Sequence, residues 1–216
     1  MEDALRNLSE PELNSLELIE TLRFTPGEGL ARRDLHLDRM ARSATALGFP
    51  FRRDAAAGVL DTVTGPGIRR VRLTLNRKGR FGVASAPLAP TPDHWTVTIG
   101  LDRIDAADPW LRHKTTRRAL YDRTRADLPV GVDEVLFCNH DGALCEGTIT
   151  NIFLQAGAAL LTPRLSAGVL PGVLRQHLLA TGMAREADLT PADLSEAKAL
   201  YVGNSLRGLI PARLLT

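Results

Sequence analysis

The sequence has few cysteines, no long apolar run and no signal-peptide character, and each of these absences excludes a class of protein. Only two of its 216 residues are cysteines, which excludes a disulfide scaffold and fits a reducing compartment. No apolar run approaches the ~20 residues that a membrane-spanning helix needs. The N-terminal stretch MEDALRNLSEPELNSLELIE is acidic and polar, unlike a signal peptide. We therefore expect a cytoplasmic protein that does not act at a membrane.

The net charge is also small, and lysines are few. The formal charge of +2 is too small to argue for binding to nucleic acid. Hydrophobic residues make up 44% of the chain and charged residues 24%, the composition of a globular protein with a core. Among many arginines, Lys78, Lys114 and Lys198 are the only lysines. Each lysine can therefore be considered individually as a functional amine.

No metal site is expected. Cys138, His140 and Cys145 lie close together in the sequence. A fourth ligand is missing at a suitable spacing, and an alternating strand would carry such residues in any case.

The first part of the chain predicts a small unit of strands and a helix. Residues 16–24 alternate as in a strand, and Asp34 is expected to cap a helix that ends near Gly48. Residues 68–88 predict two strands around an Arg-Lys-Gly turn. The following PLAPTPDHW contains three prolines, so we place a domain boundary near residue 90. This divides the chain into domains at 1–90 and 91–216.

The second part mixes strands and helices. Strands are predicted at 95–101, 133–139, 159–164 and 199–205, and helices at 117–128 and 171–182. The strands and helices do not follow a regular βαβ alternation, so α+β is the expected fold class.

Glu146 is the first candidate functional residue. It lies inside the apolar run of HDGALCEGTITNIFL (140–154), where a buried carboxylate costs several kcal/mol unless a positive group neutralises it. An ion pair with an arginine is the simplest explanation. However, the chain also has Lys114 in a polar segment, a helix start at LPGVLR (170–175) that suits an anion, and a hydroxyl in GNS (203–205). A phosphorylated, cationic aldehyde cofactor would require this combination of groups.

Six motifs in a fixed order support this interpretation through a family resemblance. They are IETLR (19–23), HLDRMARSA (36–44), HKTTRR (113–118), CEGTITNIF (145–153), LPGVLR and GNSLRGLIP (203–211). The set resembles the class IV, or fold type IV, pyridoxal-phosphate enzymes, which include branched-chain and D-amino-acid aminotransferases and aminodeoxychorismate lyase. The resemblance implies a small α/β N-terminal domain, a larger C-terminal domain around a β-barrel, pyridoxal 5'-phosphate as cofactor, and a homodimer.

The resemblance also assigns roles to individual residues. Lys114 matches the lysine that holds the cofactor covalently, and Glu146 matches the carboxylate that pairs with the pyridine nitrogen. Arg39 matches an arginine that binds the phosphate. The remaining phosphate positions are the backbone N–H groups of Ile149, Thr150, Val173 and Leu174, and the hydroxyl of Ser205.

Some positions depart from the family pattern. Branched-chain enzymes have a tyrosine five residues after the lysine to support the phenolic oxygen of the cofactor, but here that residue is Ala119. Tyr121 is the nearest phenol, and it could equally be a packed helix residue. Arg117 stands where relatives often have asparagine, and Leu174 stands where they often have threonine.

The resemblance is greatest to aminodeoxychorismate lyase, which releases pyruvate and leaves 4-aminobenzoate, a folate precursor. Thr21 falls where lyases have a threonine facing the cofactor and branched-chain enzymes have glycine. Arg23 is a candidate for binding a substrate carboxylate, as is Arg77. The alternatives are a class IV aminotransferase acting on branched-chain or D-amino acids, and a protein that keeps the fold without catalysis.

Overall fold

The computed structural model describes residues 8–215. The chain forms two compact units. Unit 1 runs up to Pro90 and includes His113–Arg117; unit 2 contains Thr91–Arg112 and the chain from Arg118 onward. The expected domains at 1–90 and 91–216 stay a prediction, and residues 1–7 and 216 of those ranges lie outside the described residues. Residues 113–117, which carry the HKTTR part of a motif, pack with unit 1.

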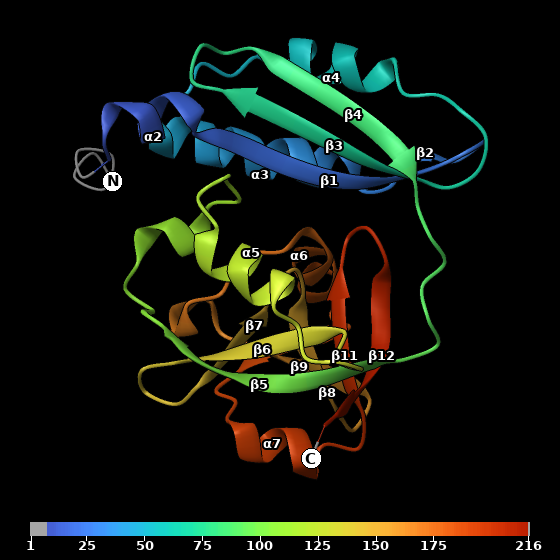
Figure 1. The fold of residues 1–216 in the computed structure, drawn as a ribbon. Helices are drawn as coiled ribbons and strands as arrows, with labels where there is room; N and C mark the ends of the chain where they lie inside the picture. The colour runs from blue at the N-terminus through green and yellow to red at the C-terminus, as the bar shows by residue number, and fades with distance from the viewer. Residues whose placement is uncertain (1–7, 216) are drawn as a thin grey trace. The chain divides into compact units, whose positions relative to one another are not determined.

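Unit 1 is a four-stranded antiparallel sheet with helices (Figure 1). The strand order is β2-β1-β3-β4. The strands are β1 (Glu17–Thr25), β2 (Gly29–Leu30), β3 (Arg69–Asn76) and β4 (Phe81–Pro87); the helices are α2 (Glu10–Ser15), α3 (Arg33–Leu47) and α4 (Arg53–Asp61). The strands expected in 16–24 and 68–88 are thereby confirmed.

The period of two in β1 and β3 separates the two faces of this sheet. Directly paired residues point to the same side, so Leu22 and Val71 lie on one face, while Thr21 and Arg72 lie on the other. Leu22 and Val71 are fully buried, whereas Arg72 is exposed. The apolar face carries the core of unit 1, and α3 packs against β1. The polar face is the one that carries Thr21.

The start of α3 differs from the prediction. Asp34 is not the N-cap, because the helix begins at Arg33 and its N-cap is Arg32, which has a left-handed φ of 53°. Asp34 lies in the first turn, where its carboxylate accepts a hydrogen bond from Arg53 at 2.9 Å. The helix ends as expected at Gly48, whose φ of 66° suits a glycine C-cap.

Unit 2 is built on a second sheet, in the order β10-β9-β8-β11-β12-β5-β6-β7. Strand β7 also pairs with β8, which closes six strands from β8 to β7 into a barrel. The strands are β5 (Trp95–Ile104), β6 (Glu134–Asn139), β7 (Leu144–Gly147), β8 (Asn151–Ala156), β9 (Ala159–Pro163), β10 (Ala184–Ala187), β11 (Leu200–Asn204) and β12 (Gly208–Leu214). An α+β fold with a barrel is therefore confirmed.

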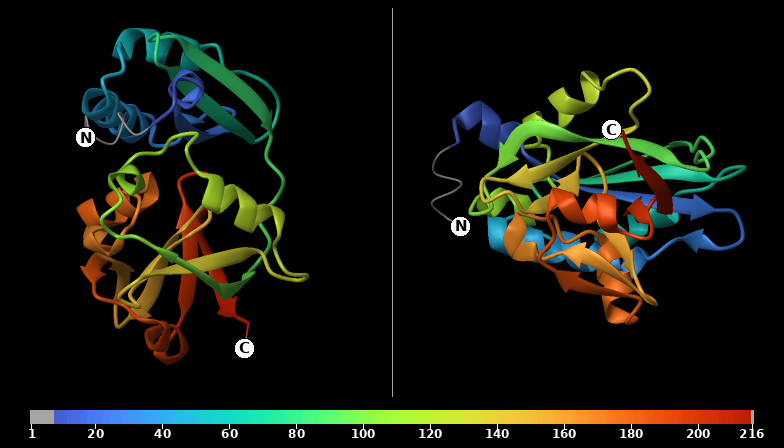
Figure 2. Two further views of the ribbon diagram at one scale, coloured as in Figure 1. Left: turned by 60° about the vertical axis from the view of Figure 1, so that its left-hand side comes forward. Right: turned by 90° about the horizontal axis from the view of Figure 1, so that it is seen from below.

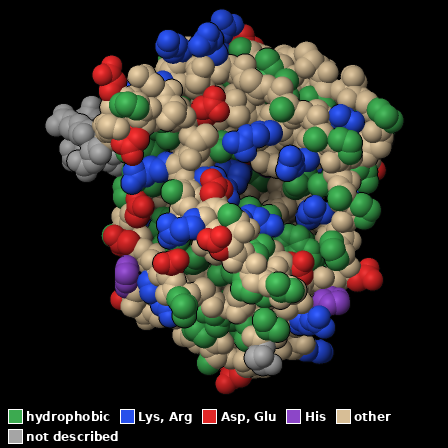
Figure 3. All heavy atoms as spheres, viewed as in Figure 1, with side chains coloured by type: hydrophobic (Ala, Val, Ile, Leu, Met, Phe, Trp, Pro, Cys, Tyr) green, Lys and Arg blue, Asp and Glu red, His purple; other side chains and the backbone are tan. Residues whose placement is uncertain are grey.

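Fully buried apolar side chains from several strands form the main core of unit 2, among them Val97, Leu136, Ile152 and Val202. The helices of unit 2 are α5 (Ala119–Ala126), α6 (Val173–Ala180) and α7 (Pro191–Glu196), with 3₁₀ turns at Pro109–Arg112 and Leu165–Ala167 (Figure 2). Among the described helices, none has both the length and the apolar character needed to cross a membrane. On the face shown in Figure 3, basic and acidic side chains are intermixed, in agreement with the small net charge.

Candidate active site

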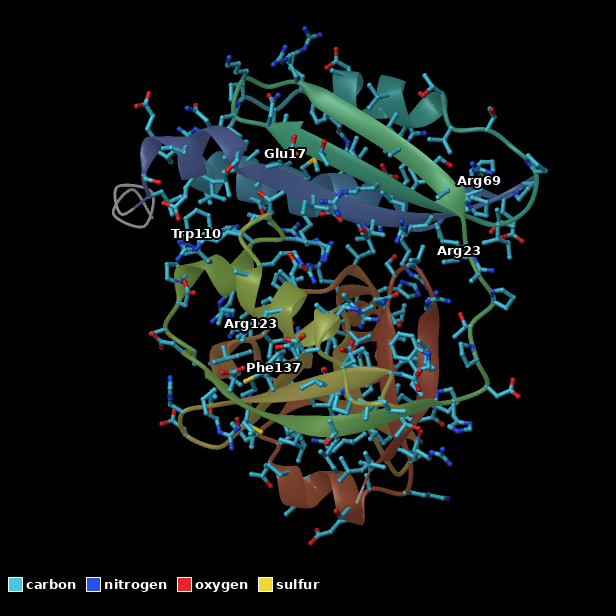
Figure 4. All side chains as sticks on the ribbon, in the orientation of Figure 1. Glu17, Arg23, Arg69, Trp110, Arg123 and Phe137 are labelled. Carbon is cyan, nitrogen blue, oxygen red and sulfur yellow. The ribbon has the colours of Figure 1, made fainter. Side chains whose placement is uncertain are left out.

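Lys114 belongs to a short segment that is hydrogen-bonded to the first strand of unit 1. The N–H of Ile19 donates to the carbonyl of Lys114 at 2.9 Å, and the N–H of Thr116 donates to the carbonyl of Glu17 at 2.9 Å. The hydroxyl of Thr116 also accepts a hydrogen bond from the N–H of Glu17 at 3.0 Å. Figure 4 labels Glu17 and Arg23, which lie toward opposite ends of β1. The backbone from the carbonyl of the candidate lysine to Thr116 is therefore fixed to β1.

Arg39, expected at the phosphate, forms a buried ion pair in unit 1. Its Nε donates to Oε1 of Glu20 at 2.9 Å, and its Nη2 donates to Oε2 at 2.6 Å. Nδ1 of His36 lies 2.5 Å from the same Oε2. This two-point contact fixes the plane of the guanidinium. The structure thus places Arg39 in a fixed orientation, and its contact with a phosphate stays a prediction.

The ionisation of this cluster follows from its neighbours. Burial raises the pKa of Glu20, but the charges of Arg39 and His36, together with their hydrogen bonds to the carboxylate, outweigh burial and lower that pKa to about 2. Burial lowers the pKa of His36 below its ordinary value, and the positive charges of Arg39 and Lys114 act in the same direction. The short contact of Nδ1 with the Glu20 carboxylate, which can only accept when ionised, makes Nδ1 the nitrogen that donates.

The polar face of the unit 1 sheet gathers positive charge beside Thr21. Arg23 is directly paired with Arg70, and Thr21 with Arg72, so the four side chains point to the same side. Like charges directly opposite each other are unfavourable in a sheet. Within residues 8–215, none of these three arginines forms an ion pair. This face therefore suits an anion.

Arg77, the other arginine considered for a substrate carboxylate, lies elsewhere in unit 1. It follows β3, and its guanidinium carbon lies 5.5 Å from the ring centre of Phe49. This is a cation–π distance, and it gives Arg77 a packing role at the β3–β4 turn.

Glu146 of unit 2 is 5% exposed and is held at both oxygens. The hydroxyl of Tyr121 donates to Oε1 at 2.8 Å, and the N–H of Leu170 donates to Oε2 at 3.0 Å. These two hydrogen bonds fix the orientation of the carboxylate. Neither of these two donors is the arginine that the simplest explanation named.

Tyr121 therefore acts on Glu146 from helix α5. Burial, followed by the charge of Glu146, raises the pKa of Tyr121 strongly, which keeps its hydroxyl protonated as a donor. Arg118 and Arg125 lie three and four residues to either side and share a helix face with Tyr121. Arg118 donates to the carbonyl of Thr148 and Arg125 to its hydroxyl, each at 3.1 Å. One face of α5 thus supports the segment from Glu146 to Thr148.

The N–H of Ile149, one of the two backbone donors expected at the phosphate in this segment, already has an acceptor. The N–H of Ile149 donates to Oε2 of Glu134 at 3.2 Å, and the hydroxyl of Thr150 donates to the same oxygen at 2.9 Å. The carbonyl of Thr150 accepts from the N–H of Gly147 at 2.8 Å. A phosphate at this segment would share it with an internal carboxylate, and its phosphate role stays a prediction.

Val173 and Leu174 begin helix α6, and their N–H groups belong to its first turn, where helical N–H groups have no intrahelical acceptor. The N-cap is Gly172, where an added Cβ would lie 1.9 Å from Oδ1 of Asn151. Asn151 also donates to the carbonyl of Leu170 at 3.1 Å. The close packing of Gly172 on Asn151 fixes the position of this helix start, which favours an anion.

Ser205 follows β11 and is 6% exposed. The side chain of Asn204 builds the turn around it, because Oδ1 accepts from the N–H groups of Leu206 at 3.1 Å and Arg207 at 2.9 Å. Nδ2 of Asn204 donates to the carbonyl of Ile149 at 3.2 Å. The turn with Ser205 and the segment after Glu146 are thereby joined within unit 2.

The residues of unit 2 fit a cofactor with a positive ring nitrogen and a phosphate. Glu146 supplies an oriented, buried carboxylate, α6 supplies first-turn N–H groups, and Ser205 supplies a buried hydroxyl. Such a donor set matches the two charged ends of pyridoxal phosphate. In unit 1, Lys114 supplies the amine on a fixed backbone.

Three buried residues near these groups were not assigned by sequence reasoning: Glu20, His36 and Glu134. The signal that drew attention to Glu146, a charge within an apolar run, is also present in LIETL and finds Glu20. Glu134 follows Asp133 at the polar start of DEVLF, so this signal does not find it. His36 has no comparable signal, because an isolated histidine on a helix is common.

Comparison with known proteins gives the family. Residues 17–215 match the family model described as amino-transferase class IV. The chain belongs to the class IV aminotransferase family. The enzymes of this family depend on pyridoxal phosphate.

Three relatives illustrate the range of this class IV family. A candidate amino-acid aminotransferase from Mesorhizobium loti has a solved structure with a TM-score of 0.88 and 45% identity, covering 93% of this chain and 100% of that one. A candidate aminodeoxychorismate lyase from Schizosaccharomyces pombe is 30% identical over 184 residues, 80% of this chain and 79% of the relative. A candidate branched-chain-amino-acid aminotransferase from Thermotoga maritima is 27% identical over 112 residues, 47% of this chain and 41% of the relative. The relatives thus include both lyases and aminotransferases.

Proposed function

We propose that this class IV enzyme is a cytoplasmic, pyridoxal-phosphate-dependent 4-amino-4-deoxychorismate lyase that releases pyruvate and leaves 4-aminobenzoate. The observation that carries this choice is the sheet face on which Thr21 lies with Arg23, Arg70 and Arg72. The similarity to a candidate lyase from S. pombe supports the same choice.

The chemistry of the substrate explains why this sheet face matters. Pyruvate and 4-aminobenzoate each carry a carboxylate, so the molecule from which both derive carries two. A branched-chain amino acid carries one carboxylate and an apolar side chain. Three arginines without an internal ion pair provide more positive charge than one carboxylate requires. The face is therefore better suited to the substrate with two anionic groups.

Each proposed catalytic residue has a defined task. When bound, pyridoxal phosphate supplies a positively charged ring that accepts the electron pair left at the substrate Cα. Glu146, oriented by Tyr121 and Leu170, holds the proton on the ring nitrogen. Lys114, once replaced by the substrate amine, takes the proton from Cα as general base. Its fixed backbone limits the volume that the amine can sample.

Thr21 and the phosphate ligands complete the assignment. The hydroxyl of Thr21 orients or protonates the leaving pyruvyl group, and Arg23 binds a substrate carboxylate. Arg39, the α6 N–H groups of Val173 and Leu174, and the Ser205 hydroxyl bind the phosphate. The two-point ion pair with Glu20 keeps Arg39 in one orientation for this purpose.

A second candidate function is that of an amino-acid aminotransferase. It is favoured by the solved structure from M. loti, because 45% identity over 93% of the chain exceeds the similarity to the S. pombe lyase. The two functions differ in their need for an acceptor. An aminotransferase forms its keto acid in steady state only when a 2-oxo acid is supplied, whereas the lyase needs none.

The test is pyruvate release from 4-amino-4-deoxychorismate without any 2-oxo acid. The wild type should release pyruvate and show a visible cofactor band that borohydride fixes to Lys114. Lys114→Ala should lose the label and the activity. Thr21→Val should keep the label but lose roughly 10²-fold in rate, the usual contribution of a positioned acid or base. Turnover that depends entirely on a 2-oxo acid would instead support the aminotransferase.

A further inference from the structure

Glu134 is a buried carboxylate to which the proposed reaction gives no task. It is the first residue of β6 and is 0% exposed. A carboxylate without solvent is costly unless several donors satisfy it. The groups that donate to Glu134 therefore identify the segment that its carboxylate stabilises.

Most of the donors to Glu134 come from the segment that follows Glu146. Oε1 accepts the N–H of Thr148 at 3.0 Å and also the Thr148 hydroxyl. Oε2 accepts the N–H of Ile149 at 3.2 Å and the hydroxyl of Thr150 at 2.9 Å. The remaining neighbours are the N–H of Val135 at 3.2 Å and Nη1 of Arg125, which lies 3.5 Å from Oε1. Four of these six contacts thus come from the three consecutive residues 148–150.

Gly147 shows how closely Glu134 approaches the residue next to Glu146. A Cβ at position 147 would lie 2.8 Å from Cδ and Cγ of Glu134 and 2.5 Å from Oγ1 of Thr150. Any side chain at this position would displace the carboxylate from the turn. Gly147 also donates its N–H to the carbonyl of Thr150. The turn from residue 147 to 150 is consequently closed around the Glu134 side chain.

This arrangement resembles an anion-binding loop whose anion is supplied by the protein. Two consecutive N–H groups and two hydroxyls converge on one carboxylate, as they would on a phosphate. The N–H of Ile149 is directed to this internal anion. In unit 2, the expected phosphate groups other than Ile149 are the N–H groups of Thr150, Val173 and Leu174 and the hydroxyl of Ser205.

We propose that Glu134 is a positioning residue that fixes the 147–150 turn and, through it, the carboxylate of Glu146. This inference rests on the proposed use of pyridoxal phosphate. It replaces Ile149 as a phosphate ligand, because the same N–H group cannot serve both anions fully. Glu134 then acts mainly on the ring end of the cofactor, and the turn reaches the Ser205 end only through the bond from Asn204 to the carbonyl of Ile149.

The two ends can be separated by comparing two aldehydes. Dissociation constants for pyridoxal phosphate and for pyridoxal, which lacks the phosphate, are measured by absorbance for the wild type and Glu134→Gln. In Glu134→Gln, an NH₂ group replaces one carboxylate oxygen and faces the N–H and hydroxyl donors of residues 148–150, which it cannot accept. Both dissociation constants should therefore rise by the same factor, roughly tenfold or more. Glu196→Gln, which removes one exposed charge at the end of α7, should change neither constant.

Thr150→Val provides a second variant in case Glu134→Gln does not fold. It removes one hydroxyl donor to Glu134 and keeps the backbone N–H of residue 150. The loss should be smaller and again equal for the two aldehydes. A loss confined to pyridoxal phosphate would overturn the proposal, because it would place the cofactor phosphate on this turn.

Two other outcomes remain distinguishable. Unchanged constants in a variant with a lower urea midpoint would show a structural role alone and also overturn the proposal. A wild type that binds neither aldehyde would instead contradict the proposed use of the cofactor.

Discussion

At the scale of single residues, the contact between Tyr121 and Glu146 decides what the phenol does. Its one hydroxyl proton is donated to Oε1 at 2.8 Å. Tyr121→Phe removes this donor from a buried carboxylate, so unfolding should require about 1–3 kcal/mol less. Urea denaturation of the cofactor-free protein measures this difference.

The matched control is Tyr201→Phe, because the Tyr201 hydroxyl has no hydrogen bond with any residue in 8–215. It should leave the urea midpoint nearly unchanged. If Tyr121→Phe altered the cofactor spectrum without changing the stability of the cofactor-free protein, Tyr121 would be a cofactor ligand instead of a support for Glu146.

At the scale of elements, Glu20 joins strand β1 to helix α3 through His36 and Arg39. Its pKa is lowered to about 2 in the folded protein from an ordinary 4.5. The stabilisation is therefore complete above about pH 4.5 and is lost as the pH falls toward 2, on the order of 3 kcal/mol in total. Urea unfolding across this range should show the loss in the wild type.

Glu20→Gln should remove this pH dependence and also destabilise the protein at pH 7, since it leaves the buried charge of Arg39 without its partner. Glu17→Gln, on the same strand, should retain the pH dependence of the wild type. An identical pH profile for Glu20→Gln and the wild type would show that the ion pair does not link β1 to α3 energetically.

At the scale of the whole molecule, we propose a homodimer, as the class IV resemblance implies. Light scattering after gel filtration should give about twice the 23.5 kDa of one chain. The mass should not fall on tenfold dilution within the micromolar range. A mass of one chain at all concentrations would contradict this proposal.

Local patterns in the sequence predicted much of the fold. Alternation located β1, β3 and β4, and the glycine at position 48 located the end of α3. Helices α2, α4 and α7 were missed, and Asp34, expected as the N-cap of α3, lies two residues after the observed N-cap, Arg32. These are short or surface elements, whose ends depend on tertiary contacts such as the bond from Arg53 to Asp34.

In the candidate site, too, local sequence patterns predicted some features and tertiary contacts decided the others. By itself, the sequence determined the family through ordered motifs, the charge of Glu146 within an apolar run, and the lysine at position 114, because residue type and spacing are local properties. Only the tertiary structure decided that Tyr121 and Leu170 hold Glu146, that Glu20 holds Arg39, and that Glu134 fills the turn after Glu146. Each of these contacts joins residues well separated in the sequence, and their pairing is set by strand register and barrel closure.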